Sequence, residues 1–184
     1  DLQQELGLTF VVVTHDQEEA MTMADRIAIL DKGQVMQVAT PAEIYEAPGS
    51  RFVANFVGNV NMFEGKVAAR DADTARITGA TGAEIVVANA GDAAAGTTVA
   101  FAIRPEKIKV SSKKPDNAGV NAMEGEVYDI AYLGDMTIYH VRLSDGQVVK
   151  AAALNAARVT DDPLTWNDRA WISFQPDAGV VLTR

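Results

Sequence analysis

The feature that most constrains the fold is an apolar run near the start of the chain, Phe10–Val13, which ends two residues before His15. Three consecutive valines without polar alternation predict a strand buried on both faces, as in a parallel α/β sheet. Asp16 can cap a helix, with Glu19 three residues later as in a capping box. His15 is therefore expected at the carboxyl end of a strand, where open α/β sheets bind ligands and a helix N-terminus favours phosphate.

Composition excludes several classes of protein. No apolar run approaches the roughly 18–20 residues that span a bilayer, and the first residues show no signal-peptide pattern, so a soluble chain is expected. The net charge of −9 comes without a basic stripe, which argues against a nucleic-acid partner. The chain has no cysteine, which rules out disulfides and thiolate metal sites and fits a reducing compartment.

The first part of the chain, residues 1–58, is expected to be an incomplete α/β unit. Residues 2–6 have the pattern of a final helical turn whose start is missing, and a single buried strand at Phe10–Val13 needs neighbours that this sequence does not supply. Beyond His15 the pattern predicts, in order, a helix over Gln17–Asp25, a hairpin of Ile27–Leu30 with Val35–Val38, a helix opened by Thr40 and Pro41, and a helix capped by Ser50 that ends at Gly58.

The remainder, residues 59–184, is expected to be mainly β. Short strand candidates separated by Gly, Asp and Asn predict a small barrel or sandwich, and the exposed segment Lys113–Gly119 divides this region into two halves near 111–121. The candidate strands are Phe63–Ala69, Ala75–Thr78, Glu84–Ala88, Thr98–Ile103, Lys107–Val110, Gly125–Leu133, Met136–Leu143, Gln147–Ala152 and Ala170–Phe174.

The other side chains with possible chemistry are better explained structurally. The two histidines, His15 and His140, would have to combine with carboxylates to bind zinc, and His140 alternates within a strand pattern. No Gly-x-Ser-x-Gly segment accompanies either of them, which argues against an acyl-transfer triad. Trp166 and Trp171 are expected to be core or interface anchors, and Arg104 with Glu106 is expected to tie a turn together.

Several segments, in this order and spacing, resemble the ATP-binding subunits of ABC importers: Val13–Ala20, Ala24–Ala28, Gly33–Gln37, Thr40–Tyr45, Phe52–Gly58 and Asn61. Two later segments, Ile103–Ile108 and Tyr132–Asp135, resemble the transport-associated OB-fold (TOBE) region of that family. Within the family, Ala131–Asp135, Tyr139–Leu143 and Pro163–Trp166 are most similar to polyamine importers of the putrescine type.

The resemblance implies a fold and a role for one residue. Residues 1–58 would be the C-terminal end of the nucleotide-binding domain, and residues 59–184 an OB-fold-like barrel for regulation or dimerisation. His15 would be the switch histidine that contacts the γ-phosphate of ATP in the intact subunit, with Mg²⁺ as the second cofactor. The partners would be a second copy and the membrane permease subunits, and the location the inner face of the cell membrane.

The motifs that hold nucleotide in this family are absent from the sequence. No Gly-x-x-x-x-Gly-Lys-Ser/Thr phosphate loop, signature segment or Mg²⁺-binding acidic pair occurs. The chain is therefore expected to be the C-terminal fragment of a transport ATPase, with no cofactor bound to the fragment and no hydrolysis by the fragment itself. The alternative is a stand-alone OB-fold module that binds a small ligand.

Overall fold

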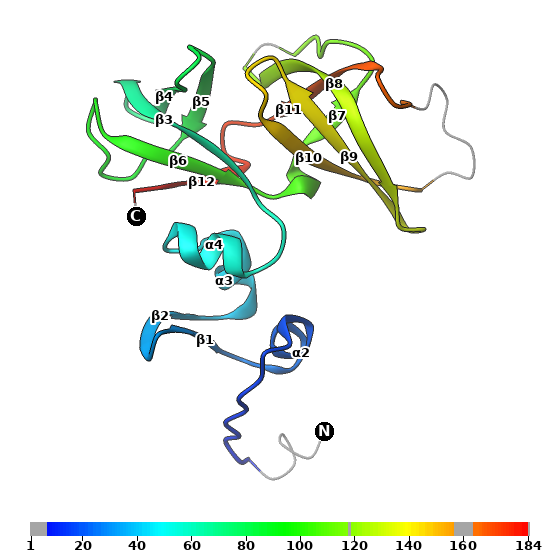
Figure 1. Ribbon diagram of the computed structural model, residues 1–184. Helices are drawn as coiled ribbons and strands as arrows, with labels where there is room; N and C mark the ends of the chain where they lie inside the picture. Colours follow the sequence, from blue (N-terminus) through cyan, green and yellow to red (C-terminus); the bar gives the residue numbers. More distant parts are fainter. Residues whose placement is uncertain (1–6, 118, 157–163, 184) are drawn as a thin grey trace.

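The computed structural model describes residues 7–117, 119–156 and 164–183. Figure 1 shows two groups of strands that lie together, with a smaller N-terminal unit of short helices and one hairpin beneath them. The N-terminal unit contains α2 (Gln17–Met23), β1 (Ile27–Asp31), β2 (Gln34–Ala39), α3 (Pro41–Glu46) and α4 (Arg51–Phe56). None of the helices in the described ranges is long and apolar enough to cross a membrane.

The helices of the N-terminal unit begin where the sequence predicts them. The side chain of Asp16 accepts hydrogen bonds from the backbone at the start of α2, and that of Ser50 does the same at α4. Thr40 and Glu43 form a reciprocal capping box at α3. Helix α2 ends at Met23, two residues before the predicted end at Asp25.

The prediction of a buried strand at Phe10–Val13 is wrong for this chain. The segment has no regular secondary structure, and its side chains are exposed, Val13 by 96%. A strand needs a neighbour for its backbone donors and acceptors, and the described chain places none beside this segment. The expected helical turn over residues 2–6 lies outside the described residues.

The β-rich part consists of two five-stranded antiparallel sheets. Their strand orders are β12-β6-β3-β4-β5 and β10-β9-β8-β11-β7. The strands are β3 (Asn61–Arg70), β4 (Thr74–Thr78), β5 (Glu84–Ala88), β6 (Thr98–Ile103), β7 (Lys109–Ser111), β8 (Asn121–Tyr132), β9 (Met136–Leu143), β10 (Val148–Leu154), β11 (Arg169–Phe174) and β12 (Gly179–Leu182). Three outcomes differ from the sequence expectation: β12 was not predicted, residues 105–107 form a 3₁₀ turn, η1, before β7 begins, and β8 begins at Asn121 instead of Gly125.

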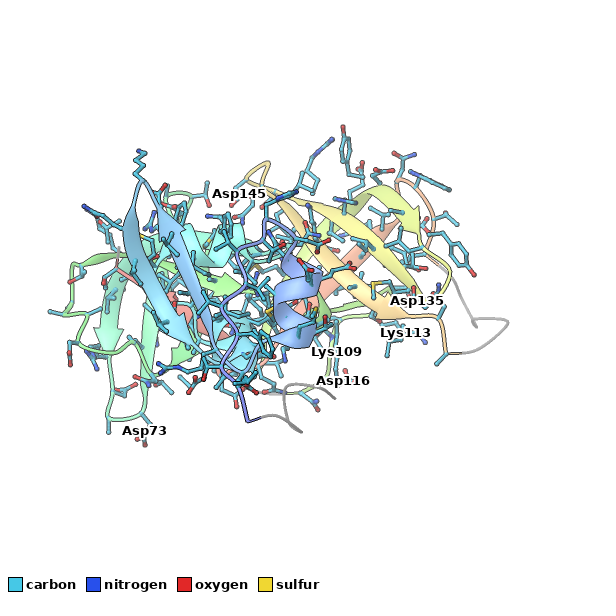
Figure 2. All side chains as sticks on the ribbon, turned by 90° about the horizontal axis from the view of Figure 1, so that it is seen from below. Asp73, Lys109, Lys113, Asp116, Asp135 and Asp145 are labelled. Atoms are coloured by element: carbon cyan, nitrogen blue, oxygen red, sulfur yellow. The ribbon has the colours of Figure 1, made fainter. Side chains whose placement is uncertain are left out.

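The two sheets are versions of one unit, a relation that the predicted strands alone do not imply. Strands β3 to β6 correspond in order and pairing to β8 to β11, and we call these the first half and the second half. Asn-x-x-Glu-Gly-x-Val occurs in β3 from Asn61 and again in β8 from Asn121. A bulge follows the valine in both strands, after Val67 and after Val127. Figure 2 shows Asp73 and Asp135, from the equivalent hairpin turns, on different sides of the molecule.

Each half completes the sheet of the other. Strand β7 follows the first half in sequence but pairs with β11, whereas β12 follows the second half and pairs with β6. Strand β10 also lies against β7 and η1, so the second sheet curls toward a barrel. The halves share one hydrophobic core, in which the rings of Phe63 and Phe101 both lie against Phe174, with centroids 5.5 and 5.8 Å away.

A pair of asparagines fastens the halves at equivalent places. The Asn61 amide donates to the backbone oxygen of Lys150 at 2.8 Å and accepts from its N–H at 2.8 Å. The Asn121 amide does the same to Val86, at 2.8 and 2.7 Å. Each side chain thus continues the hydrogen bonding of a strand in the opposite half.

Candidate functional site

His15, the residue predicted to be functional, is exposed immediately before α2. Gln17, two residues later, bonds to the region after α4. Its side-chain amide donates to the backbone oxygen of Phe56 and accepts from the N–H of Gly58. The start of α2 is therefore attached to the end of α4. The side chain of His15 itself faces solvent, at the place where the sequence predicts a strand-to-helix junction.

The second histidine does not join it. His140 lies in β9 of the second half, and its Nδ1 atom is buried without a hydrogen-bond partner. Within the described ranges no group of three or more His, Cys, Asp or Glu side chains could hold a metal ion. The structural interpretation of His140 as a strand histidine agrees with this placement.

Among the described residues, Arg104 makes the most hydrogen bonds between the N-terminal unit and the sheets. It follows β6 and is only 4% exposed. Its Nη1 donates to the backbone oxygens of Ala54 and Asn59, both at 3.1 Å. Its Nε and Nη2 donate to the backbone oxygen of Tyr45 at 3.3 and 3.1 Å, and its guanidinium carbon lies 4.2 Å from the Tyr45 ring centroid. Burial lowers the pKa of Arg104 from its usual value.

Two further contacts reinforce this junction. The Tyr45 hydroxyl donates to Glu106 Oε1 at 2.9 Å, and Lys107 Nζ lies 3.0 Å from Glu46 Oε1. Burial, together with the bond to Glu106, raises the pKa of Tyr45 to about 12. Arg104 and Glu106 are structural residues, as the sequence suggested, but they reach the helices of the N-terminal unit instead of tying their own turn.

The second half shows that the turn itself does not require the arginine. Gln175-Pro176-Asp177 follows β11 as Arg104-Pro105-Glu106 follows β6. Both turns close with the same backbone bond, Lys107 N–H to Arg104 O at 3.0 Å and Ala178 N–H to Gln175 O at 3.1 Å. We infer that Arg104 serves the N-terminal unit and that the turn does not depend on it.

Small residues on the first half allow the helices to dock there. Ala54 of α4 packs in a cluster with Ala102 of β6 and Leu182 of β12. The neighbouring Ala100 is fully buried, whereas the equivalent position in the second half is Trp171, which is half-buried beneath Lys114 Nζ at 5.1 Å. A helix could not approach the second half as closely, because the indole stands where the first half has only a methyl group.

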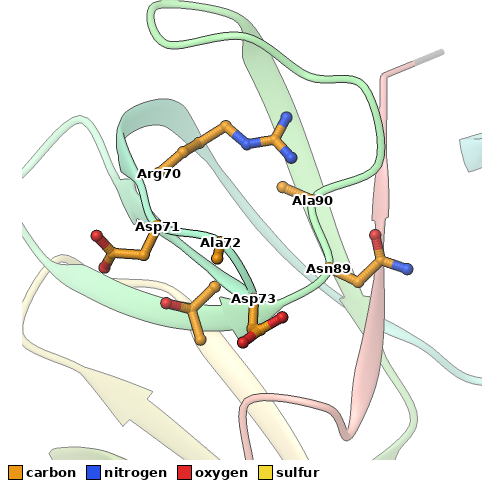
Figure 3. Close-up of a pocket in the computed structure, with 7 residues that line it drawn as sticks. Arg70, Asp71, Ala72, Asp73, Asn89 and Ala90 are labelled. Carbon is orange, nitrogen blue, oxygen red and sulfur yellow. The ribbon is translucent and has the colours of Figure 1, made fainter.

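A hollow of about 190 Å³ opens at the turn between β3 and β4 (Figure 3). The Arg70 guanidinium is held by a bond to the backbone oxygen of Ala93 at 2.9 Å. The carboxylates of Asp71 and Asp73 point to different sides in Figure 3 and do not converge on one point. None of the side chains predicted to be functional lines this hollow.

Comparisons with known proteins find one domain match and several similar proteins. The family model of the TOBE domain matches residues 101–182. The putrescine transport ATP-binding protein PotG of Escherichia coli (strain K12) is 44% identical over 185 residues, which cover 100% of this chain and 48% of PotG. The spermidine/putrescine import ATP-binding protein PotA of Thermobifida fusca (strain YX) is 40% identical over 184 residues, 98% of this chain and 46% of that protein. The chain thus spans about half the length of these relatives.

A solved structure supports the fold. The cytoplasmic molybdate-binding protein ModG superposes with a TM-score of 0.61 at 16% identity, covering 67% of this chain and 96% of that one. The fold is therefore mainly β and OB-fold-like, as the sequence analysis expected. Residues 101–182 thus match the TOBE domain, and the chain is similar along its whole length to ATP-binding proteins of polyamine transport.

Proposed function

We propose that this chain is part of the ATPase subunit of an ABC importer for polyamines such as putrescine. The observation that carries the proposal is the 44% identity to PotG along the whole chain. In the intact subunit, ATP hydrolysis is coupled to uptake through permease subunits, and the subunit works as a pair of copies at the inner face of the cell membrane. Residues 1–58 end the nucleotide-binding domain, and residues 59–184 form the regulatory or dimerisation region.

His15 is the catalytic residue of this proposal. Its exposed imidazole can donate an N–H to a phosphate oxygen, and the start of α2 is held in place through Gln17. Phosphoryl transfer depends on positioning and charge stabilisation, and the His15 imidazole would supply both at the γ-phosphate. ATP and Mg²⁺ are the cofactors of the intact subunit. Residues beyond this sequence hold them, since it contains no phosphate loop, and this chain by itself does not hydrolyse ATP.

The direct test is His15→Ala in the intact subunit. We expect ATP binding to stay within about twofold of wild type and the hydrolysis rate to fall by at least about a hundredfold, since the side chain acts in positioning. His140→Ala is the matched control, because the second half is remote from the start of α2, and it should leave hydrolysis unchanged. An unaltered rate in His15→Ala would remove His15 from the mechanism.

A second candidate function is a stand-alone binding module for a small ligand. The similarity of fold to ModG favours it, because ModG binds molybdate. The genomic sequence upstream of Asp1 separates the two functions. An open reading frame that continues into a phosphate loop supports the ATPase subunit, and an initiator codon directly before Asp1 supports the module.

A further inference from the structure

The two halves share one fold, so a comparison of equivalent positions shows which side chains the fold does not require. Among the described residues, the first half exposes one large hydrophobic side chain, Val86. The second half and its connections expose six: Tyr128, Tyr132, Leu133, Val148, Leu154 and Trp166. Such an excess on one half is a property of its surface and is not needed to build the unit.

The centre of this surface is a stacked pair on the outer face of the second sheet. Tyr128 is the extra residue of the bulge in β8, and Arg142 of β9 places its guanidinium carbon 3.8 Å from the ring centroid. The first half has Ala68 and Thr78 at these two positions. The bulge therefore forms equally well around an alanine, and the tyrosine–arginine pair is an addition.

A third aromatic residue extends the surface. Trp166 is 58% exposed, and its Nε1 lies 3.5 Å from Oδ1 of Asp129, the residue after Tyr128. Trp166 belongs to the connection between β10 and β11, residues 155–168, whereas the equivalent connection in the first half spans only residues 89–97. We call Tyr128, Asp129, Arg142 and Trp166 the Tyr128 face.

The composition of the Tyr128 face is that of a protein interface. Tyrosine, tryptophan and arginine are the residues most enriched among those that dominate binding energy. The charges are mixed, because Arg142 stands directly opposite Glu126 in the sheet and Asp129 lies nearby. A surface that carries both signs can match a rotated copy of itself, as a two-fold contact requires.

The position of the face is compatible with that occupant. The helices of the N-terminal unit contact the first half, on β6 and β12. Figure 1 shows β8 and β9 at the upper right, apart from α3 and α4. Two chains can therefore meet through the second half without displacing the N-terminal unit.

We propose that the Tyr128 face is the surface through which two copies of this protein associate about a two-fold axis, with Arg142 of each copy placed against the acidic side chains of the other. The proposal rests on the pairing of copies in the proposed function and names the surface that makes it. Polar pairs of this kind fix the register of the contact, while the aromatic rings supply most of the buried apolar area.

The test replaces residues of the second half by those at the equivalent positions of the first half. Tyr128→Ala combined with Arg142→Thr gives the second half the residues of the first half at the same positions, so the fold should persist, as the circular dichroism spectrum would verify. Sedimentation velocity at micromolar concentration should show wild-type dimers and at least a tenfold weaker dimer for the double variant. Arg76→Ala, which removes an exposed arginine from β4 of the first half, should dimerise like wild type.

Trp166→Ser, in a surface connection, is the second variant and should weaken the dimer as well. A wild-type protein that stays monomeric overturns the proposal, as do variants that dimerise as tightly as wild type. Failure of this proposal does not by itself overturn the proposed function. Uptake of putrescine is measured in cells and does not depend on the dissociation constant of the dimer in solution.

Discussion

The guanidinium of Arg104 lies 4.2 Å from the ring centroid of Tyr45 and donates two hydrogen bonds to the backbone oxygen of the same residue. One buried side chain thus contacts both the ring and the main chain of Tyr45, near the end of α3. It also reaches Ala54 and Asn59, so that the last helices of the N-terminal unit and the segment leading into β3 converge on it.

Arg104→Gln should weaken the contact between the N-terminal unit and the sheets. Glutamine stands at the equivalent position in the second half, so the turn before β7 should form, but three carbonyl oxygens would lose charged donors. We expect a loss of about 2–4 kcal/mol in the free energy of unfolding, measured by urea denaturation. Arg76→Gln, an exposed arginine, should change the free energy by less than about 0.5 kcal/mol.

The pH dependence of stability should show the contribution of Tyr45. Its pKa in the folded protein is raised to about 12, above the value of about 10 for an unfolded chain. The bond to Glu106 is therefore fully present below pH 10 and is lost as the pH rises toward 12. The difference in thermal stability between wild type and Tyr45→Phe should shrink over that range. A difference that stays constant from pH 9 to 12 would contradict this assignment.

The two asparagine clamps should contribute about equally. Asn61→Ala and Asn121→Ala each leave a buried backbone N–H and a C=O without their partners, at Lys150 and Val86 respectively. Each variant should lower the free energy of unfolding by about 1–3 kcal/mol, measured by denaturant titration. Asn117→Ala, in the exposed segment before β8, should have no measurable effect.

Gly65 and Gly125 should not tolerate alanine. A Cβ at Gly65 would lie 2.5 Å from the backbone oxygen of Thr78, and one at Gly125 would lie 2.6 Å from that of Arg142. Because backbone atoms of a paired strand cannot move aside, each alanine should lower the melting temperature by several degrees, about 4–8 °C per kcal/mol in a domain of 60–100 residues. Gly79→Ala, where the nearest atoms are 3.5 Å away, should melt close to wild type.

Local patterns predicted local structure well. Asp16, Thr40 and Ser50 are helix caps in the structure because a short polar side chain before an apolar periodic stretch has few better hydrogen-bonding options. The hairpin of β1 and β2 follows from Lys32 and Gly33, both with positive φ. The strand predicted at Phe10–Val13 did not form, since a strand depends on partners that pattern alone cannot supply.

Long-range relations were harder to predict. The repeated Asn-x-x-Glu-Gly-x-Val at Asn61 and Asn121 is the one sequence signal that predicts two equivalent halves. Strand β12 is only four residues long, and its partner β6 is distant in sequence, so no local period marks it. The role of Tyr45 depends on a contact with residues about sixty positions away, which no local pattern encodes.

The most direct measurement of the central claim is uptake of labelled putrescine by cells that lack their own polyamine ATPase subunit. These cells should receive the cognate permease and binding protein together with either the intact wild-type subunit or its His15→Ala form. We predict uptake with the wild-type subunit and a fall to the background level with His15→Ala at equal protein abundance. The account would be contradicted if cells with the wild-type subunit took up no putrescine, or if cells with His15→Ala took up as much as those with the wild-type subunit.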